Sequence, residues 1–222
     1  MRGNGKQKTV LTAAGELQSY GTQLEQHEHD PEYDRRLLRG ERTRHHIAQA
    51  MIELIEEGNP RPTARLIAER AGVSIRLVFH HFDDVEEVFQ EGAIVQAQRH
   101  WKKVVPIDPA GAVADRVEAV CRQRRQLYQA ITPVRRAAVT RSAGSTALVE
   151  LLQLSRTVLR DQLTSTFAPE LDRGGIDPGL LLDALESATS WEVWERLRSE
   201  KRTAIAAQRV MEFTVTSLLG CP

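Results

Sequence analysis

Few side chains in this sequence have the type and spacing that catalysis or metal binding requires. The two cysteines, Cys121 and Cys221, lie far apart, and neither has a second ligand at metal-binding spacing. In the pairs His45-His46 and His80-His81 the residues are adjacent, so on a helix the two rings of each pair point in different directions. No Ser/His/Asp arrangement or pair of carboxylates stands out. The sequence therefore favours no enzyme, no cofactor and no metal site.

The residues from Ser74 to Leu77 suit a different chemistry, the recognition of DNA bases. Ser74 begins a short predicted helix, and Ile75, Arg76 and Leu77 lie at its exposed start. An arginine can donate two hydrogen bonds to a guanine in the major groove, and apolar side chains can contact the methyl groups of thymine. Because two apolar residues on an exposed helix start need such a partner, we predict that this helix contacts base edges.

The stretch 63–89 contains the elements that position these residues. Thr63 can cap one helix with its hydroxyl, Gly72 can end that helix at a positive φ, and Ser74 can cap the next helix. The turn Ala71-Gly72-Val73-Ser74 therefore sets two helices at a sharp angle. Two helices joined in this way form a helix-turn-helix, whose second helix lies in the major groove of DNA.

Two longer helices are expected to flank this motif. Apolar residues with helical spacing predict a helix over about 41–57, which Gly58 ends. A second helix is expected to begin after Asp83-Asp84, whose carboxylates can cap it, and to continue to about residue 104. This helix is long enough to connect the motif to the rest of the chain.

Overall charge argues mildly against a nucleic-acid partner, whereas local charge does not. The chain has 30 Lys+Arg and 30 Asp+Glu residues, a formal net charge of +0 and a pI of about 7.1. DNA-binding domains are often basic overall, although one basic face is sufficient. The residues from Arg42 to His46 crowd the start of the 41–57 helix, where cations oppose the helix dipole. DNA phosphate would relieve that conflict, and a solvated basic helix end is the alternative.

The remaining sequence predicts only helices. Apolar patterns indicate helices over about 113–128 and 148–163, and Thr132-Pro133 and Asp177-Pro178 each read as an N-cap followed by proline at the first helical position. The last helix, over about 202–219, carries two apolar stripes. One stripe includes Ala207, Met211 and Val215, and the other Ala206, Val210 and Phe213. A helix that is apolar on two faces is buried twice, so we expect a partner subunit on the second face.

Compartment and chain size also constrain the class of protein. A chain of 222 residues can hold one large helical domain or two smaller ones. No apolar run approaches membrane-spanning length, and the N-terminus lacks the apolar core of a signal peptide. Two widely spaced cysteines fit a reducing compartment. We therefore expect a soluble cytoplasmic protein with no membrane partner.

The segment 41–89 resembles the DNA-binding domain of the tetracycline-repressor (TetR) family of bacterial transcriptional regulators. The residues that carry the resemblance are Thr63, Ile67-Ala68, Ala71-Gly72-Val73-Ser74, Val78-Phe79, His81-Phe82, Glu86-Glu87 and Phe89. The resemblance implies an all-α fold in three parts. These are a flexible N-terminal extension at 1–39, a three-helix helix-turn-helix domain at 40–88, and a C-terminal regulatory and dimerisation domain at 89–222.

The resemblance also implies partners and site residues. The protein would be a homodimer that binds a palindromic double-stranded DNA operator, most simply as a repressor, and that a small-molecule effector releases. Its last two helices would pair with those of the second subunit. The residues expected to contact DNA are Arg42, Arg44, Thr63, Arg65, Ser74, Ile75, Arg76, Leu77, Phe79, His80 and His81.

Three departures from the family pattern favour an alternative. Phe79 replaces a frequent tyrosine and lacks its hydroxyl, and Val85 replaces a common lysine. The acidic residues 83–84 and 86–87 add negative charge near the expected phosphates. Each lost cation reduces the counterion-release contribution to affinity. The alternative function is a helical dimeric ligand-binding module that has weakened or lost sequence-specific DNA binding.

The sequence says little about the effector site. The large aromatic side chains of the C-terminal part are candidates for an apolar pocket, and a plain packed core is the alternative. These residues are Trp101, Tyr128, Phe167, Trp191 and Trp194. Arg135, Arg136 and Arg141 are candidates for binding an anionic ligand, with a solvated helix face as the alternative.

Overall fold

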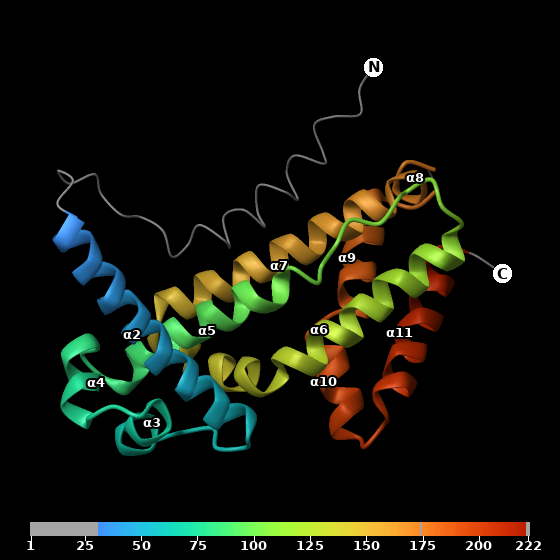
Figure 1. Ribbon diagram of the computed structural model, residues 1–222. Helices are drawn as coiled ribbons and strands as arrows, with labels where there is room; N and C mark the ends of the chain where they lie inside the picture. The colour runs from blue at the N-terminus through green and yellow to red at the C-terminus, as the bar shows by residue number, and fades with distance from the viewer. Residues whose placement is uncertain (1–30, 174, 221–222) are drawn as a thin grey trace. The chain divides into compact units, whose positions relative to one another are not determined.

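The computed structural model describes residues 31–173 and 175–220. This part of the chain consists of helices and connecting loops without any strand, which confirms the all-α prediction (Figure 1). Its contacts divide it into two compact units. The first unit contains 31–99 and 133–151, and the second contains 100–132 and 152–220. The predicted domain boundaries stay predictions, although the boundary between 88 and 89 falls inside a continuous helix.

The first unit is built on the helix-turn-helix. It contains α2 (Pro31–Glu56), α3 (Ala64–Ala71), α4 (Ile75–His81) and α5 (Val85–Trp101) up to residue 99. The end of α6 (Val113–Arg141), the short helix η1 (Ser142–Gly144) and the start of α7 (Thr146–Thr166) complete it. Its first four helices share one apolar core, whose buried members include Ile47, Ala48, Met51, Ile52, Ile67, Ala68, Val78, Phe82, Val88 and Phe89.

Helix α2 begins earlier than the apolar pattern predicts. We predicted a start near Glu41, whereas the helix begins at Pro31, so the predicted start is wrong and the residues of the extension from 31 to 39 are helical. Proline is favourable at the first helical position because no N–H is needed there. Leu38 is 49% exposed, and from Leu38 onward the first buried side chain is Ile47, so this part of α2 adds no periodic apolar signal. The rest of the predicted extension, 1–30, lies outside the described residues.

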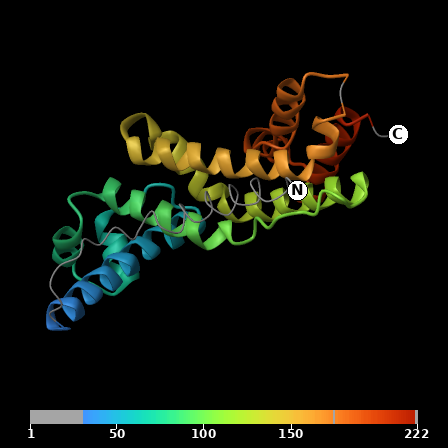
Figure 2. The same ribbon diagram turned by 90° about the horizontal axis from the view of Figure 1, so that it is seen from above.

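The second unit contains the other helices. It includes α6 up to residue 132, α7 from residue 152, α8 (Ala168–Leu171), α9 (Pro178–Ala188), α10 (Trp191–Ser199) and α11 (Ala204–Leu218). Helices α9, α10 and α11, coloured orange to red, cluster together in both views (Figures 1 and 2). Their side chains pack with α6 and α7 around a core that includes Val117, Val120, Cys121, Tyr128, Phe167, Leu185, Trp194, Met211 and Val215.

Thr132-Pro133 does not begin a new helix, so that prediction is wrong. Helix α6 continues through Pro133 to Arg141. The Thr132 hydroxyl donates to the Tyr128 carbonyl at 2.6 Å and accepts from Trp191 Nε1 at 3.1 Å. A threonine that bonds back to the carbonyl one turn earlier, and forward to a buried tryptophan, favours continuation of the helix over capping.

The predicted helix start at Asp177-Pro178 is confirmed by its cap, and two further helices of this unit begin with the same kind of cap. Asp177 accepts from the Leu180 N–H at 2.8 Å and begins α9. Ser190 begins α10 and Thr203 begins α11 in the same way. These side chains satisfy backbone donors that have no partner within the helix.

Candidate nucleic-acid interface

The turn between α3 and α4 has the geometry that its residues predict. Thr63 Oγ1 accepts from the Leu66 N–H at 3.4 Å, and Gly72 ends α3 with φ 63° and ψ 31°. Ser74 Oγ then accepts from the Leu77 N–H at 3.1 Å at the start of α4. Because a residue with a Cβ rarely adopts that φ, glycine at 72 allows the chain to turn sharply between the two helices.

Close packing behind the motif holds α3 and α4 in place. Val78 on α4, Phe82 directly after it and Ile67 on α3 are buried, and both helices contact α2. At Gly92, α5 approaches α2 so closely that an added Cβ would lie 2.8 Å from Ile52 side-chain carbons and 3.0 Å from the Ala48 carbonyl oxygen. The close-packed core therefore fixes the positions of α3 and α4, and with them the orientation of the outer face of the motif.

The outer face of α4 exposes a mixed apolar and basic surface. Ile75 is 44% exposed and Phe79, one turn later, is 50% exposed. Arg76 lies beside them, is exposed, and forms no hydrogen bond or ion pair with any described residue. Leu77 is half-buried, so it is the least available of the three residues predicted to read bases. This face of α4 can enter a major groove, where Arg76 could bind a base edge and the apolar side chains could contact thymine methyl groups.

The predicted phosphate contacts around α3 are also accessible. Thr63 and Ser74 are exposed at the two helix starts, with their oxygens used as caps. The Arg65 side chain is 78% exposed and pairs with Glu69 at 2.8 Å on the same helix. Arg42 is exposed on α2. An exposed pair between neighbouring turns is weak, so Arg65 can exchange Glu69 for a phosphate at little cost.

Arg44 is engaged inside the first unit. Its guanidinium donates to the His81 carbonyl, pairs with Glu87 Oε1 at 2.7 Å and lies 4.2 Å from the centre of the Phe82 ring. Glu91 Oε2 lies 3.5 Å from Arg44 Nε. Through these contacts Arg44 joins α2 to the end of α4 and the start of α5. Its predicted phosphate contact stays a prediction, because the guanidinium already has acceptors within the protein.

Two of the acidic residues at the start of α5 are neutralised by arginines of the same unit. The hydrogen bond from Arg44 holds the pKa of Glu87 below its usual value. Glu86 pairs with Arg141 at 3.0 Å. Asp84 Oδ1 accepts from the Glu87 N–H at 2.8 Å, and Glu87 Oε2 accepts from the Asp83 N–H at 2.7 Å, a reciprocal capping arrangement. These acids therefore stabilise α5, which explains part of the departure from the family pattern.

The histidines of this unit have different roles. His80 is exposed and His81 is half-buried, with ring centres 5.3 Å apart. Burial, with the nearby His80 and Arg44, lowers the pKa of His81, so its ring is neutral near pH 7. His46 Nε2 lies 3.1 Å from the Ala71 carbonyl oxygen and links α2 to the turn. Sequence reasoning missed this link, because nothing in the local pattern indicates a contact across the fold.

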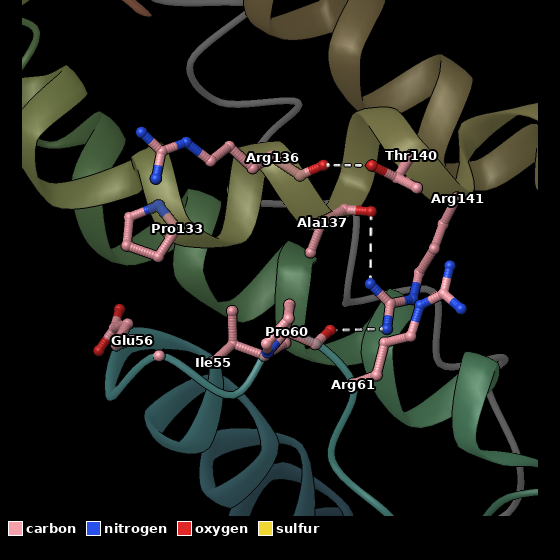
Figure 3. Close-up of a pocket in the computed structure, with 10 residues that line it drawn as sticks. Ile55, Glu56, Pro60, Arg61, Pro133, Arg136, Ala137, Thr140 and Arg141 are labelled. Atoms are coloured by element: carbon pink, nitrogen blue, oxygen red, sulfur yellow. Dashed lines mark hydrogen bonds between the residues drawn. The ribbon is translucent and has the colours of Figure 1, made fainter. Parts of the chain in front are cut away.

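A pocket of about 460 Å³ lies between the loop after α2 and the last turns of α6, both in the first unit (Figure 3). Arg141 closes one side of it by donating to the Pro60 carbonyl at 3.0 Å, and the same guanidinium lies 4.4 Å from the Phe89 ring centre. Arg61 lies near the Arg141 end of the view, whereas Arg136 is directed to the opposite end. The Arg141 side chain is only 10% exposed, so it is a packed link between helices and not part of a solvated face.

The aromatic side chains predicted to line an effector pocket are all buried in the second unit. Trp101 and Trp191 are 8% exposed, and Tyr128, Phe167 and Trp194 are 1% exposed or less. The Tyr128 hydroxyl donates to the Thr189 carbonyl at 2.8 Å. The Tyr128 and Trp194 ring centres are 6.1 Å apart. These contacts are those of a packed core, and the assignment to an effector pocket stays a prediction.

Comparison with known proteins decides the class of the first unit. Residues 47–91 match the family model described as bacterial regulatory proteins, tetR family. The chain carries a TetR-family DNA-binding domain. The match covers the second half of α2, all of the helix-turn-helix and the start of α5. No curated protein and no solved structure matches the chain.

The TetR-family domain makes the chain a DNA-binding transcription regulator. The helices after residue 91 lie outside the match, so their role rests on their own geometry. None of the described helices is long and apolar enough to cross a membrane. Within the described residues, no group of three or more His, Cys, Asp or Glu side chains could hold a metal ion.

Proposed function

We propose that this chain is a cytoplasmic repressor that binds a palindromic DNA operator as a homodimer and that a small-molecule effector releases. The observation that carries the DNA-reading part is the outer face of α4. Arg76, without a partner among the described residues, lies between the exposed apolar side chains of Ile75 and Phe79. An arginine flanked by apolar contacts suits a guanine beside thymines in the major groove.

Around this reading surface we assign the phosphate contacts. Thr63 and Arg65 at the start of α3, Ser74 at the start of α4, and His80 near its end are exposed. Arg42 extends the basic surface along α2. Contacts of this kind set the position on the duplex and supply most of the salt-dependent affinity, whereas Arg76 supplies sequence preference.

The proposed dimer uses the second apolar face of α11. Phe213 is 76% exposed and Ile205 51% exposed, while Ala207, Met211 and Val215 on the opposite face are buried. Large apolar side chains on one exposed helix face are typical of an interface. Two subunits related by a two-fold axis would present two α4 helices to a palindromic site.

The effector response is proposed to reach the motif through α6. This helix passes without a break from the second unit to the first, where Arg141 at its end contacts Glu86 on α5 and the Pro60 carbonyl before α3. A shift of α6 would therefore act on α5 and on the loop before α3, the two segments next to the motif. A coupling of about 1–3 kcal/mol would weaken operator binding several-fold to over a hundred-fold.

A gel-shift assay with the DNA upstream of its own coding region tests the proposal. We expect specific binding at low salt, loss of sequence preference in Arg76→Ala, and unchanged binding in Arg122→Ala. Arg122 is a matched control because it lies on α6 in the second unit, where it pairs with Glu118. If no fragment is bound specifically and Arg76→Ala has no effect, the repressor function is refuted.

The alternative function, a ligand-binding module without operator binding, is tested by the same assay. Val85 lies at the start of α5, where the family has a lysine, and Phe79 lacks the tyrosine hydroxyl. Under this alternative Val85→Lys raises DNA affinity from near zero. Tight binding by the unaltered chain would rule the alternative out.

A further inference from the structure

Arg124 is a buried cation in the second unit that no carboxylate in the described part of the chain neutralises. It lies on α6 and is 0% exposed. Its guanidinium donates to Gln162 Oε1 at 2.7 Å and to the Leu159 carbonyl oxygen at 3.0 Å, both on α7. Both acceptors are neutral, and Arg124 Nε is buried without any acceptor in the described part of the chain. A buried charge with neutral partners and an unused donor is costly to the fold.

Arg116 shows how the same helix satisfies a buried arginine. It lies two turns before Arg124 on α6, and its side chain is 5% exposed. Glu170 accepts two hydrogen bonds from it, at 2.7 and 2.8 Å, and the Thr166 carbonyl accepts a third at 2.8 Å. The Arg116–Glu170 pair is the two-pronged arrangement in which guanidinium and carboxylate match best. Arg124 has the same donors and lacks the carboxylate.

Among the described residues, no acidic side chain acts on Arg124 from a distance either. Burial lowers the pKa of Arg124, and the nearby groups that oppose this shift are Tyr128 and Cys121. Asp161 is next to Gln162 on α7 and has one buried oxygen without a partner, but its electrostatic neighbour is Arg160. An arginine does not lose its proton in a protein at neutral pH. The positive charge at Arg124 therefore persists.

We propose that Arg124 binds the carboxylate of a small effector with an apolar body, and that this carboxylate replaces the amide oxygen of Gln162. This inference rests on the proposed function, because it names the chemical class of the effector. A carboxylate offers two parallel acceptors to the guanidinium and can reach the unused Nε donor. The buried neighbours Cys121, Leu127 and Tyr128 favour an apolar body over a second charge.

Displacement of Gln162 has a consequence beyond the site. Gln162 Nε2 donates to the Val105 carbonyl and to Gln123 Oε1, both at 2.8 Å. Gln123 in turn exchanges hydrogen bonds with the Val105 backbone at 3.1 and 3.2 Å. Val105 belongs to the segment that follows α5 in the chain. A ligand that moves Gln162 therefore weakens the hydrogen bonds that hold the segment after α5 in place. Helix α5 itself packs behind the DNA-reading motif.

Thermal unfolding of the full-length protein with benzoate and octanoate tests the site, with benzamide and octanamide as neutral controls. The expected result is a rise in Tm of about 3–5 °C at roughly ten times the Kd for at least one carboxylate, and none for its amide. Gln162→Glu places a carboxylate beside Arg124 within the chain and should abolish the response. Arg124→Met keeps the side-chain volume, removes the charge and should also abolish it.

Two further variants separate binding from folding. Arg125→Met removes the next arginine, which bonds Gln208 and Gln129, and should keep the response. If Arg124→Met does not fold, Arg124→Lys keeps the cation but loses the two-pronged geometry, and its carboxylate response should fall at least several-fold. Equal Tm rises for acids and amides, or a full response in Gln162→Glu, would overturn the proposal.

The DNA assay keeps this inference distinct from the proposed function. Specific operator binding without any carboxylate response refutes Arg124 as an effector site and leaves the regulator intact. A carboxylate response without operator binding supports the site and refutes the repressor. Release of the operator by the same carboxylate in the unaltered chain, and not in Arg124→Met, supports both.

Discussion

Arg44 on α2 and Glu87 on α5 form an ion pair of 2.7 Å beside the end of α4. The pair is one-third exposed, so solvent screens it, and the contact of Arg44 with the Phe82 ring adds to it. We expect Arg44→Ala to lower the free energy of unfolding by about 1–2 kcal/mol, from the lost pair and ring contact together. Urea unfolding measures this change, and an unchanged midpoint would contradict a role for Arg44 in joining these helices.

The same pair predicts a pH dependence. The pKa of Glu87 lies below its usual value in the folded protein, chiefly because of Arg44, so the unfolded chain binds this proton more readily. The stabilisation is present above a pH of about 4.3 and is lost as the pH falls through the folded-state pKa. Glu87→Gln should therefore lose stability at neutral pH and show a smaller further loss in acid. Urea midpoints measured at several pH values test this, with Glu118→Gln on α6 as the exposed control.

Gly92 predicts a steric effect between α2 and α5. A Cβ at this position would meet Ile52 at 2.8 Å and the Ala48 carbonyl at 3.0 Å, and the carbonyl belongs to a helix backbone that cannot move alone. Overpacking of this kind lowers the free energy of unfolding by about 1–3 kcal/mol, and the better helix propensity of alanine offsets part of this loss. Gly92→Ala should lower Tm. Gly144→Ala, where no atom lies within 4 Å, is the control and should leave Tm almost unchanged.

The helix-turn-helix could be predicted from sequence because its signals are local. Thr63, Gly72 and Ser74 act within a few residues of themselves, and each has the predicted capping role. The partners of Arg44 and Arg141 could not be predicted, because their contacts join residues 43 and 55 positions apart for Glu87 and Glu86. The prediction of a helix start at Thr132-Pro133 was wrong for the same reason, because the Thr132 hydroxyl bonds Trp191, which lies 59 positions later in the chain.

Arg65 and Arg76 should affect DNA binding in different ways. Arg65 is proposed to contact phosphate, so Arg65→Gln should weaken binding about equally for all sequences and reduce the salt slope by about 1. Arg76 is proposed to contact a base, so Arg76→Ala should cost about 1–3 kcal/mol for the operator and relax its sequence preference. Titrations against operator and unrelated DNA at several salt concentrations separate the two effects. If Arg76→Ala lowered the affinity for operator and for unrelated DNA equally, Arg76 would not contact a base.

Phe213 predicts the oligomeric state. Its side chain is 76% exposed, and Ile205 lies two turns earlier on the same side of α11. A carboxylate in the centre of an apolar interface would be buried without a partner, so Phe213→Glu should convert the dimer to a monomer of 24.9 kDa. Light scattering during size exclusion measures the mass. Val139→Glu makes the same change at an exposed apolar residue of α6 and should remain dimeric. A chain that is monomeric before substitution, or a Phe213→Glu variant that stays dimeric, would contradict an interface on this face of α11.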